Sequence, residues 1–321
     1  MRPSPMTGTV VVMNELVVQT DGLTKRYGDR LAVDRVGMTV RRGEVYGFLG
    51  PNGAGKTTTL RMTLGLIRPT SGSASVLGRP AGRAEVISRV GALIEGPGFY
   101  PYLSGRDNLR TLARCRALPR SEVERVLTLV DLTDRADDRF KGYSLGMKQR
   151  LGVAAALLGD PELIVLDEPT NGLDPAGMAD MRELIVSLAR GGRTVVLSSH
   201  LLAEVQEICD RVGVIAGGRL LRESTVAELR GEATLHIRAT PEEDALAVAM
   251  RIAGDDGVRR THDGVLELDL PAAAAPDLTR ALVAAGLDVL EINVRERSLE
   301  DVFFQMTNSQ MTNTDTLEVA S

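Results

Sequence analysis

Short apolar runs alternate with stretches of helical spacing from residue 16 to about residue 230. The strand-like runs cover 16–19, 32–40, 44–49, 90–94, 163–166, 194–198 and 212–216. The helical spacing covers 57–66, 104–117, 121–130, 145–158, 178–189 and 201–210. Ser104 and Ser121 are the expected N-caps of two of these helices. Strands that alternate with helices of this length predict an α/β fold with a mostly parallel sheet covered on both faces.

The pattern changes after Gly231. Five short segments then alternate as strand, helix, strand, helix and strand, at 235–239, 241–252, 265–270, 275–285 and 289–295. We therefore expect a first domain at 15–231 and a small α+β domain at 232–306. The polar ends of the chain, 1–14 and 307–321, are expected to be a disordered leader and a disordered tail.

Length and composition exclude several classes of protein. The 321 residues suggest about two domains. The 38 basic and 43 acidic residues give a net charge of −5, which disfavours a chain that coats nucleic acid. No apolar run approaches the ~18–20 residues that span a bilayer. Cys115 and Cys209 form no metal-ligand pattern, so reduced thiols in an intracellular compartment are expected.

A glycine-rich motif follows the strand at 44–49 and precedes a helix. It matches G-x-x-x-x-G-K-[ST], in which backbone N–H groups cradle phosphate at a helix N-terminus. Lys56 is expected to reach the β- and γ-phosphates, and Thr57 to ligate Mg²⁺. The expected nucleotide-binding residues here are Gly50, Pro51, Asn52, Gly53, Ala54, Gly55, Lys56, Thr57 and Thr58.

An acidic pair, Asp167 and Glu168, ends the apolar run at 163–166. Such a pair alone is more often a loop start or a helix cap. Downstream of a phosphate-binding loop, Asp167 is expected to lie near the Mg²⁺ and Glu168 to polarise the attacking water.

Three further motifs surround the acidic pair. A helix opens with the residues from Tyr143 to Arg150, Gly172-Leu173-Asp174 follows the acidic strand, and His200 follows the strand at 194–198. The order of these motifs after the phosphate-binding loop resembles the ATP-binding cassette (ABC) ATPases over about residues 16–230. The resemblance implies an ABC ATPase domain at 15–231 with a helical subdomain, and a small accessory domain behind it.

The resemblance also implies roles for individual residues. Tyr27 would stack on adenine, although a strand-edge tyrosine is the alternative. Ser144 and Gly146 would grip the γ-phosphate of ATP held by the opposite subunit of a homodimer, and Asp174 would organise that dimer interface. His200 would hold the γ-phosphate and the water, so Glu168 and His200 form the expected catalytic pair.

Two departures from the commonest pattern of these ATPases point to a subgroup. Leu145 and Met147 replace two residues of the usual signature, and Glu95 stands where a glutamine usually touches Mg²⁺. The expected metal-binding residues are therefore Thr57, Glu95 and Asp167. These features resemble bacterial exporters that include bacitracin-resistance and lantibiotic-immunity systems, and residues 297–303 resemble a short motif near the end of drug-export cassettes.

We therefore expect the ATP-binding and ATP-hydrolysing subunit of a bacterial ABC exporter, with ATP and Mg²⁺ as cofactors. It would power a separate transmembrane permease for drug, antibiotic or peptide efflux. We expect it in the cytoplasm, peripheral at the inner face of the cell membrane, with no nucleic-acid partner. The alternatives are a soluble cassette ATPase acting on the ribosome or DNA, and a regulatory module that uses ATP only as a clamp.

Overall fold

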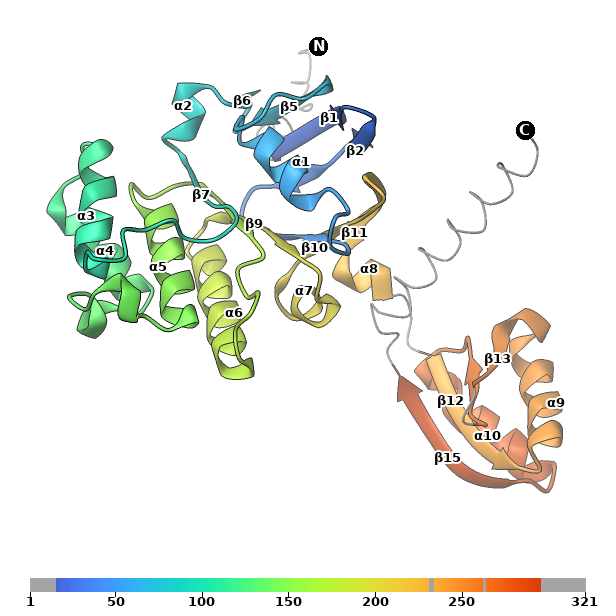
Figure 1. Cartoon of the computed structure of the whole chain (residues 1–321). Helices are drawn as coiled ribbons and strands as arrows, with labels where there is room; N and C mark the ends of the chain where they lie inside the picture. Colours follow the sequence, from blue (N-terminus) through green and yellow to red (C-terminus); the bar gives the residue numbers. More distant parts are fainter. Residues whose placement is uncertain (1–15, 231–233, 262–263, 296–321) are drawn as a thin grey trace, which may run out of the picture. The chain divides into compact units, whose positions relative to one another are not determined.

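The computed structural model describes residues 16–230, 234–261 and 264–295 (Figure 1). The chain divides into two compact units, and the division falls between Thr225 and Val226. The expected leader, the expected tail and the motif at 297–303 lie outside the described residues, as does the expected domain boundary at 231–232.

The central sheet of the first unit has six strands. In spatial order they are β11 (Arg219–Thr225), β10 (Arg211–Ala216), β4 (Val45–Leu49), β9 (Thr194–Ser199), β8 (Leu163–Asp167) and β7 (Val90–Leu93). All neighbours are parallel except β11, which pairs antiparallel with β10. Every residue of β4 and β8 is buried, which explains why these strands read as continuous apolar runs. The predicted α/β fold with a mostly parallel sheet is confirmed.

A second, antiparallel sheet in this unit was not expected. It contains β1 (Leu16–Tyr27), β2 (Arg30–Val36), β3 (Thr39–Arg41), β5 (Ser71–Val76) and β6 (Arg79–Pro80). The single strand predicted at 32–40 is wrong, because two strands, β2 and β3, cover this range and Gly37 and Met38 separate them. Near the end of β2, Arg35 has a φ of 49°. In β5 only Val76 is buried, so this strand has no hydrophobic period to detect.

The helices of the first unit pack on and between these sheets. They are α1 (Lys56–Thr63), α2 (Ala84–Ile87), α3 (Gly105–Cys115), α4 (Arg120–Leu129), α5 (Leu145–Leu157), α6 (Pro175–Arg190) and α7 (Leu202–Ile208), with the 3-10 helices η2 (Thr133–Arg135) and η3 (Phe140–Gly142). Helix α1 lies between the two sheets, where Leu60 and Met62 share one core with Val18 of β1 and Phe48 of β4 (Figure 1). Helices α3 and α4 pack on each other and on α5, as expected for a helical subdomain.

The two predicted N-caps have different outcomes. The Ser104 hydroxyl accepts a hydrogen bond from the backbone N–H of Asp107 at 3.0 Å, which confirms this residue as the cap of α3. The prediction for Ser121 is wrong, because α4 already begins at Arg120 and Pro119 occupies the N-cap position. Proline fixes φ near the value that a helix start needs, so the helix begins directly after Pro119.

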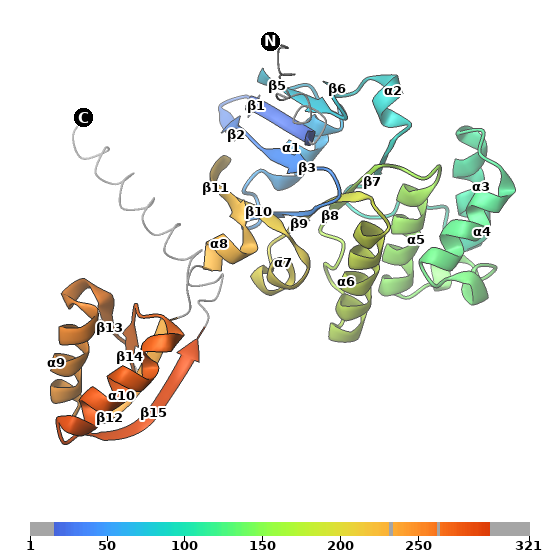
Figure 2. The same ribbon diagram turned by 180° about the vertical axis from the view of Figure 1, so that it is seen from behind.

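Two glycines allow helices to pack close to the central sheet. Figure 2 shows the sheet and its helices from behind. A Cβ at Gly91 of β7 would lie 2.0 Å from the Ala156 carbonyl oxygen of α5. A Cβ at Gly47 of β4 would lie 2.8 Å from Cγ1 of Val205 on α7. Helix α7 therefore lies directly against β4, the strand that leads into the glycine-rich motif.

The second unit is an α+β sandwich. It contains α8 (Val226–Arg230), β12 (Thr234–Thr240), α9 (Glu242–Ala253), η4 (Asp255–Gly257), β13 (Val258–Arg260), β14 (Leu266–Leu268), η5 (Ala272–Ala274), α10 (Ala275–Ala284) and β15 (Asp288–Arg295). The strand order is β13-β14-β12-β15, and every pair is antiparallel. Leu235 and Ile237 alternate with more exposed residues and join Leu278 of α10 in the core. The five predicted segments are present, and β13 is an additional strand.

Candidate active site

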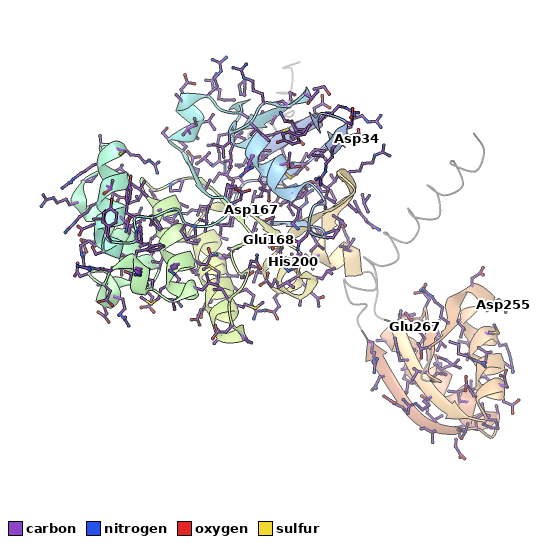
Figure 3. All side chains as sticks on the ribbon, viewed as in Figure 1. Asp34, Asp167, Glu168, His200, Asp255 and Glu267 are labelled. Carbon is purple, nitrogen blue, oxygen red and sulfur yellow. The ribbon has the colours of Figure 1, made fainter. Side chains whose placement is uncertain are left out.

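The chemically active residues of the first unit meet where three parallel strands end. Strand β4 leads into the glycine-rich motif, β8 ends at Asp167, and β9 ends next to His200. Because β8 and β4 both pair with β9 in parallel, their carboxyl ends lie at the same edge of the sheet. Figure 3 shows the labelled Asp167, Glu168 and His200 close together at this edge. We call residues 50–57 the phosphate loop from here on.

The glycines of the phosphate loop are required by its geometry. A Cβ at Gly50 would lie 2.2 Å from the Ile215 carbonyl oxygen, and one at Gly55 would lie 2.6 Å from that of Ala32. Gly55 also has a φ of 105°, a conformation that other residues rarely adopt. The loop therefore folds tightly against neighbouring backbone and leads directly into the N-terminus of α1, which attracts anions.

Lys56 is the buried cation of the site. Its side chain is 5% exposed, and its Nζ donates to the Gly50 carbonyl at 2.6 Å and lies 3.0 Å from Oε1 of Glu168. An ammonium group held this way has lost most of its hydration. It is therefore placed to make short charge-assisted hydrogen bonds with an anion in the loop.

Asp167 is fixed by two hydroxyl groups. Its Oδ2 accepts from Thr57 Oγ1 at 2.8 Å, and its Oδ1 accepts from Ser198 Oγ at 2.5 Å. Ser198 Oγ in turn accepts from the Glu168 N–H at 3.0 Å. One serine thus contacts both the Asp167 carboxylate and the backbone of Glu168. Sequence reasoning did not single out this role, because the residues are 31 positions apart in the chain.

Glu168 connects the cation to the imidazole. Its Oε2 lies 2.6 Å from His200 Nδ1, while Oε1 pairs with Lys56. Its backbone has a φ of 50°, which costs of order 1–3 kcal/mol for a non-glycine residue and is concentrated at functional sites. A carboxylate held by an imidazole at the wall of a phosphate-binding loop has the geometry of a general base.

A cavity of about 390 Å³, called the first cavity here, opens beside the phosphate loop. It is lined by Tyr27, Arg30, Ala32, Pro51, Asn52, Gly53, Gly55, Lys56, Thr57, Thr58 and Glu168. The Tyr27 ring is half-exposed and lines this cavity, and the Lys25 ammonium lies over the ring, 5.1 Å from its centroid. Arg30 and Ala32 were missed, because one arginine after a hairpin turn carries no distinctive sequence signal.

A second cavity, of about 560 Å³, contains the other predicted contacts. Ser144, Gly146 and Asp174 all line it. Ser144 caps α5 by accepting from the Met147 N–H at 3.2 Å, and Asp174 caps α6 by accepting from the Gly177 N–H at 3.0 Å. Within one chain, the structure therefore separates these three residues from the first cavity.

Glu95 does not line the first cavity. It follows β7 with a φ of 60°, and its largely exposed carboxylate forms an ion pair with Arg61 of α1. Its contact with a metal stays a prediction. Among the residues that the structure describes, no cluster of three or more His, Cys, Asp or Glu side chains could hold a metal by itself.

Comparisons with known proteins agree with this geometry. The family model described as ABC transporter matches residues 33–171. The chain is 40% identical to a bacitracin transport ATP-binding protein of Bacillus licheniformis, over 90% of this chain and 97% of that protein. It is 35% identical to a daunorubicin resistance ATP-binding protein of Streptomyces coeruleorubidus, over 92% and 97% of the two chains. A solved ATP-binding subunit of an ABC transporter matches with a TM-score of 0.60 and 29% identity, over 67% of this chain and 92% of that one.

Proposed function

This chain belongs to the ABC transporter family as an ATP-binding and ATP-hydrolysing subunit, and from that premise we propose how its two cavities work. The first cavity holds ATP, with the phosphates in the phosphate loop and adenine on the exposed Tyr27 ring. The observation that carries the proposal is Glu168, which bridges Lys56 and His200 at the wall of this cavity.

The donor groups beside the phosphate loop suit Mg²⁺. Thr57 and Asp167 offer a hydroxyl and a carboxylate oxygen 2.8 Å apart, and Mg²⁺ in nucleotide sites takes few protein ligands because phosphate and water supply the others. This explains why a nucleotide-bound metal needs no acidic cluster. When bound, Mg²⁺ would neutralise charge on the phosphate oxygens.

Hydrolysis requires Glu168 to change partners. Phosphate oxygens compete with its carboxylate for Lys56, which frees Oε1 to accept a proton from water. The water oxygen then bonds to the γ-phosphorus, the bond from that phosphorus to the β–γ bridging oxygen breaks, and the water proton passes to Glu168. His200 holds Glu168 in place through Nδ1.

We further propose that a second copy of the chain completes each site. Ser144 and Gly146 lie at the start of α5, where a hydroxyl and a free N–H at a helix N-terminus suit an anion. They line the second cavity and not the first. Two copies facing each other would bring the second cavity of one chain against the first cavity of the other, with Asp174 at the interface.

The partner of this subunit is a separate membrane permease. No helix in the described part of the chain is long and apolar enough to cross a membrane. From the family and the named relatives we propose that the chain acts at the cytoplasmic face of a permease made by another gene, with residues 15–231 as the cassette and 232–306 as an accessory domain. The bacitracin and daunorubicin relatives favour antibiotic export as the transport function.

The test is to co-express the chain with the membrane protein encoded beside its gene. The two should copurify, and the pair should raise cellular resistance to bacitracin or to another antibiotic in a panel. The same pair carrying Lys56→Ala should copurify but confer no resistance. Equal resistance with wild-type and Lys56→Ala subunits would contradict ATP-driven export.

A further inference from the structure

A buried carboxylate outside both cavities takes no part in the mechanism described so far. Glu204, in the first turn of α7, is 3% exposed. Its Oε2 accepts hydrogen bonds from Thr170 Oγ1 and from Ser199 Oγ, each at 2.9 Å. Its Oε1 is buried and has no hydrogen-bond partner among the described residues.

The two hydroxyl groups belong to the segments that carry the catalytic pair. Thr170 lies two residues after Glu168, and the Asn171 N–H donates to the Glu168 carbonyl at 3.1 Å. Ser199 immediately precedes His200. Glu204 therefore joins, through one oxygen atom, the loop after the general base to the strand end before the histidine.

Ser199 fixes the backbone on both sides of His200. Its Oγ accepts from the Leu201 N–H at 2.9 Å, which closes a short turn with His200 at its centre. Its carbonyl accepts from the Gly50 N–H at 3.2 Å, which ties this turn to the phosphate loop. The Ser199 hydroxyl has two acceptors, Glu204 Oε2 at 2.9 Å and the Leu201 carbonyl at 3.4 Å, and Glu204 is the nearer one.

The burial of Glu204 has a cost that packing alone does not explain. A buried carboxylate oxygen without a partner is unfavourable, so the other oxygen of Glu204, which accepts from two buried hydroxyl groups, accounts for the charged side chain at this position. From this geometry we propose that Glu204 is a positioning residue, which sets the Glu168–His200 distance by holding Thr170 and Ser199 together. The inference rests on ATP hydrolysis in the first cavity.

The proposal predicts a selective kinetic defect. Glu204 lines neither cavity, so Glu204→Ala should leave KM for ATP within about 2-fold of wild type. Loss of the shared acceptor should misplace His200 relative to Glu168 and lower kcat by roughly 10- to 100-fold, because small misplacements of catalytic groups cost this much. Glu204→Gln keeps an acceptor oxygen and should retain most of the activity.

The experiment measures kcat and KM of the full chain with Mg·ATP. Thr170→Val and Ser199→Ala each remove one donor and should each lower kcat without raising KM. Glu207→Ala is the matched control, because Glu207 lies on the same helix but pairs with Arg182 at the surface. Wild-type hydrolysis, measured first, tests the ATPase activity independently of Glu204.

The double variant Glu204→Ala/Ser199→Ala separates positioning from general destabilisation. If Glu204 acts through Ser199, the double variant should be no slower than Glu204→Ala alone, since residues in one hydrogen-bond network are not additive. Multiplicative losses in the double variant would contradict the proposal. So would unchanged kcat in folded Glu204→Ala and Thr170→Val, or a Glu204→Gln variant as slow as Glu204→Ala.

Discussion

At the scale of single residues, Glu168 links the first cavity to the strand end behind it. It pairs with the buried Lys56, it is hydrogen-bonded to His200, and its backbone N–H donates to Ser198. Removing one partner of a buried ion pair usually leaves the other charge uncompensated. In this site the phosphates of bound ATP would be a second partner for Lys56. Lys56 can therefore leave Glu168 for phosphate without becoming an unpaired charge.

Lys56→Ala should abolish ATP binding. The ammonium is aimed at the phosphate loop, and the remaining loop carbonyls would repel phosphate. Titration of the full chain with nucleotide measures the affinity for ATP. Lys141→Ala is the control, because Lys141 is exposed and does not line the first cavity. ATP binding near wild-type affinity by folded Lys56→Ala would refute the assignment of the loop.

Glu168→Gln should bind ATP but hydrolyse it slowly. The amide keeps the size of the side chain but cannot accept the proton of the attacking water. Loss of a general base typically lowers the rate by ~10²–10⁴-fold. Steady-state phosphate release measures the rate, and a Glu168→Gln rate within 10-fold of wild type would assign the base to another group.

At the scale of elements, local sequence rules worked where a helix end is set by nearby residues. The capping hydroxyl of Ser104 lies three residues before the N–H that it binds, so the sequence contains the whole interaction. The wrong prediction at Ser121 also has a local cause, since the N-cap of α4 is Pro119, two residues before Ser121.

The two serines make a matched pair of substitutions. Ser104→Ala should lower the free energy of unfolding by ~1 kcal/mol, the usual cost of losing an N-cap. Ser121→Ala removes no cap and should change it by less than about 0.5 kcal/mol. Urea denaturation of both variants checks the difference, and equal losses would mean that the caps are wrongly assigned.

Glu162 makes the first unit sensitive to acid. Hydrogen bonds from Arg89 and Arg42 lower the pKa of this carboxyl from 4.5 to about 2. Because the folded-state pKa is lowered, the stabilisation is fully present above the unfolded pKa of 4.5 and is lost as the pH falls toward about 2. These three side chains are partly exposed and screened by water, so the effect is modest.

We expect Glu162→Gln to be less stable than wild type at neutral pH, and the difference to shrink as the pH falls below 4.5. Denaturation at several pH values measures it. A difference that stayed constant from pH 7 to pH 3 would show that Glu162 acts through packing and not through its charge.

At the scale of the whole molecule, the central sheet and the phosphate loop could be predicted because their signals are local. The apolar runs of β4 and β8 and the glycine spacing of residues 50–55 need no distant partner to be recognised. The antiparallel sheet could not be predicted in the same way. Its strand β3 is tied to the central sheet through Thr39, whose hydroxyl donates to Glu223 at 2.6 Å across 184 residues.

The residues of the candidate site also divide into those with a local sequence signal and those without one. Lys56, Thr57, Asp167, Glu168 and His200 were expected from motifs, and the structure brings them together. Arg30, Ser198 and Glu204 belong to none of the motifs, and their residue types are common in any strand, turn or helix. Their importance comes from contacts between segments that only the folded chain brings together.

The central claim is that each ATP lies between the first cavity of one chain and the second cavity of another. Sedimentation of Glu168→Gln with Mg·ATP tests it most directly, because slow hydrolysis should let the closed pair accumulate. We predict a dimer with ATP, a monomer without it, and a monomer with ATP when Ser144→Glu is added to repel phosphate at the second cavity. A Glu168→Gln chain that binds ATP yet sediments as a monomer at every concentration, with or without its permease, would contradict the account.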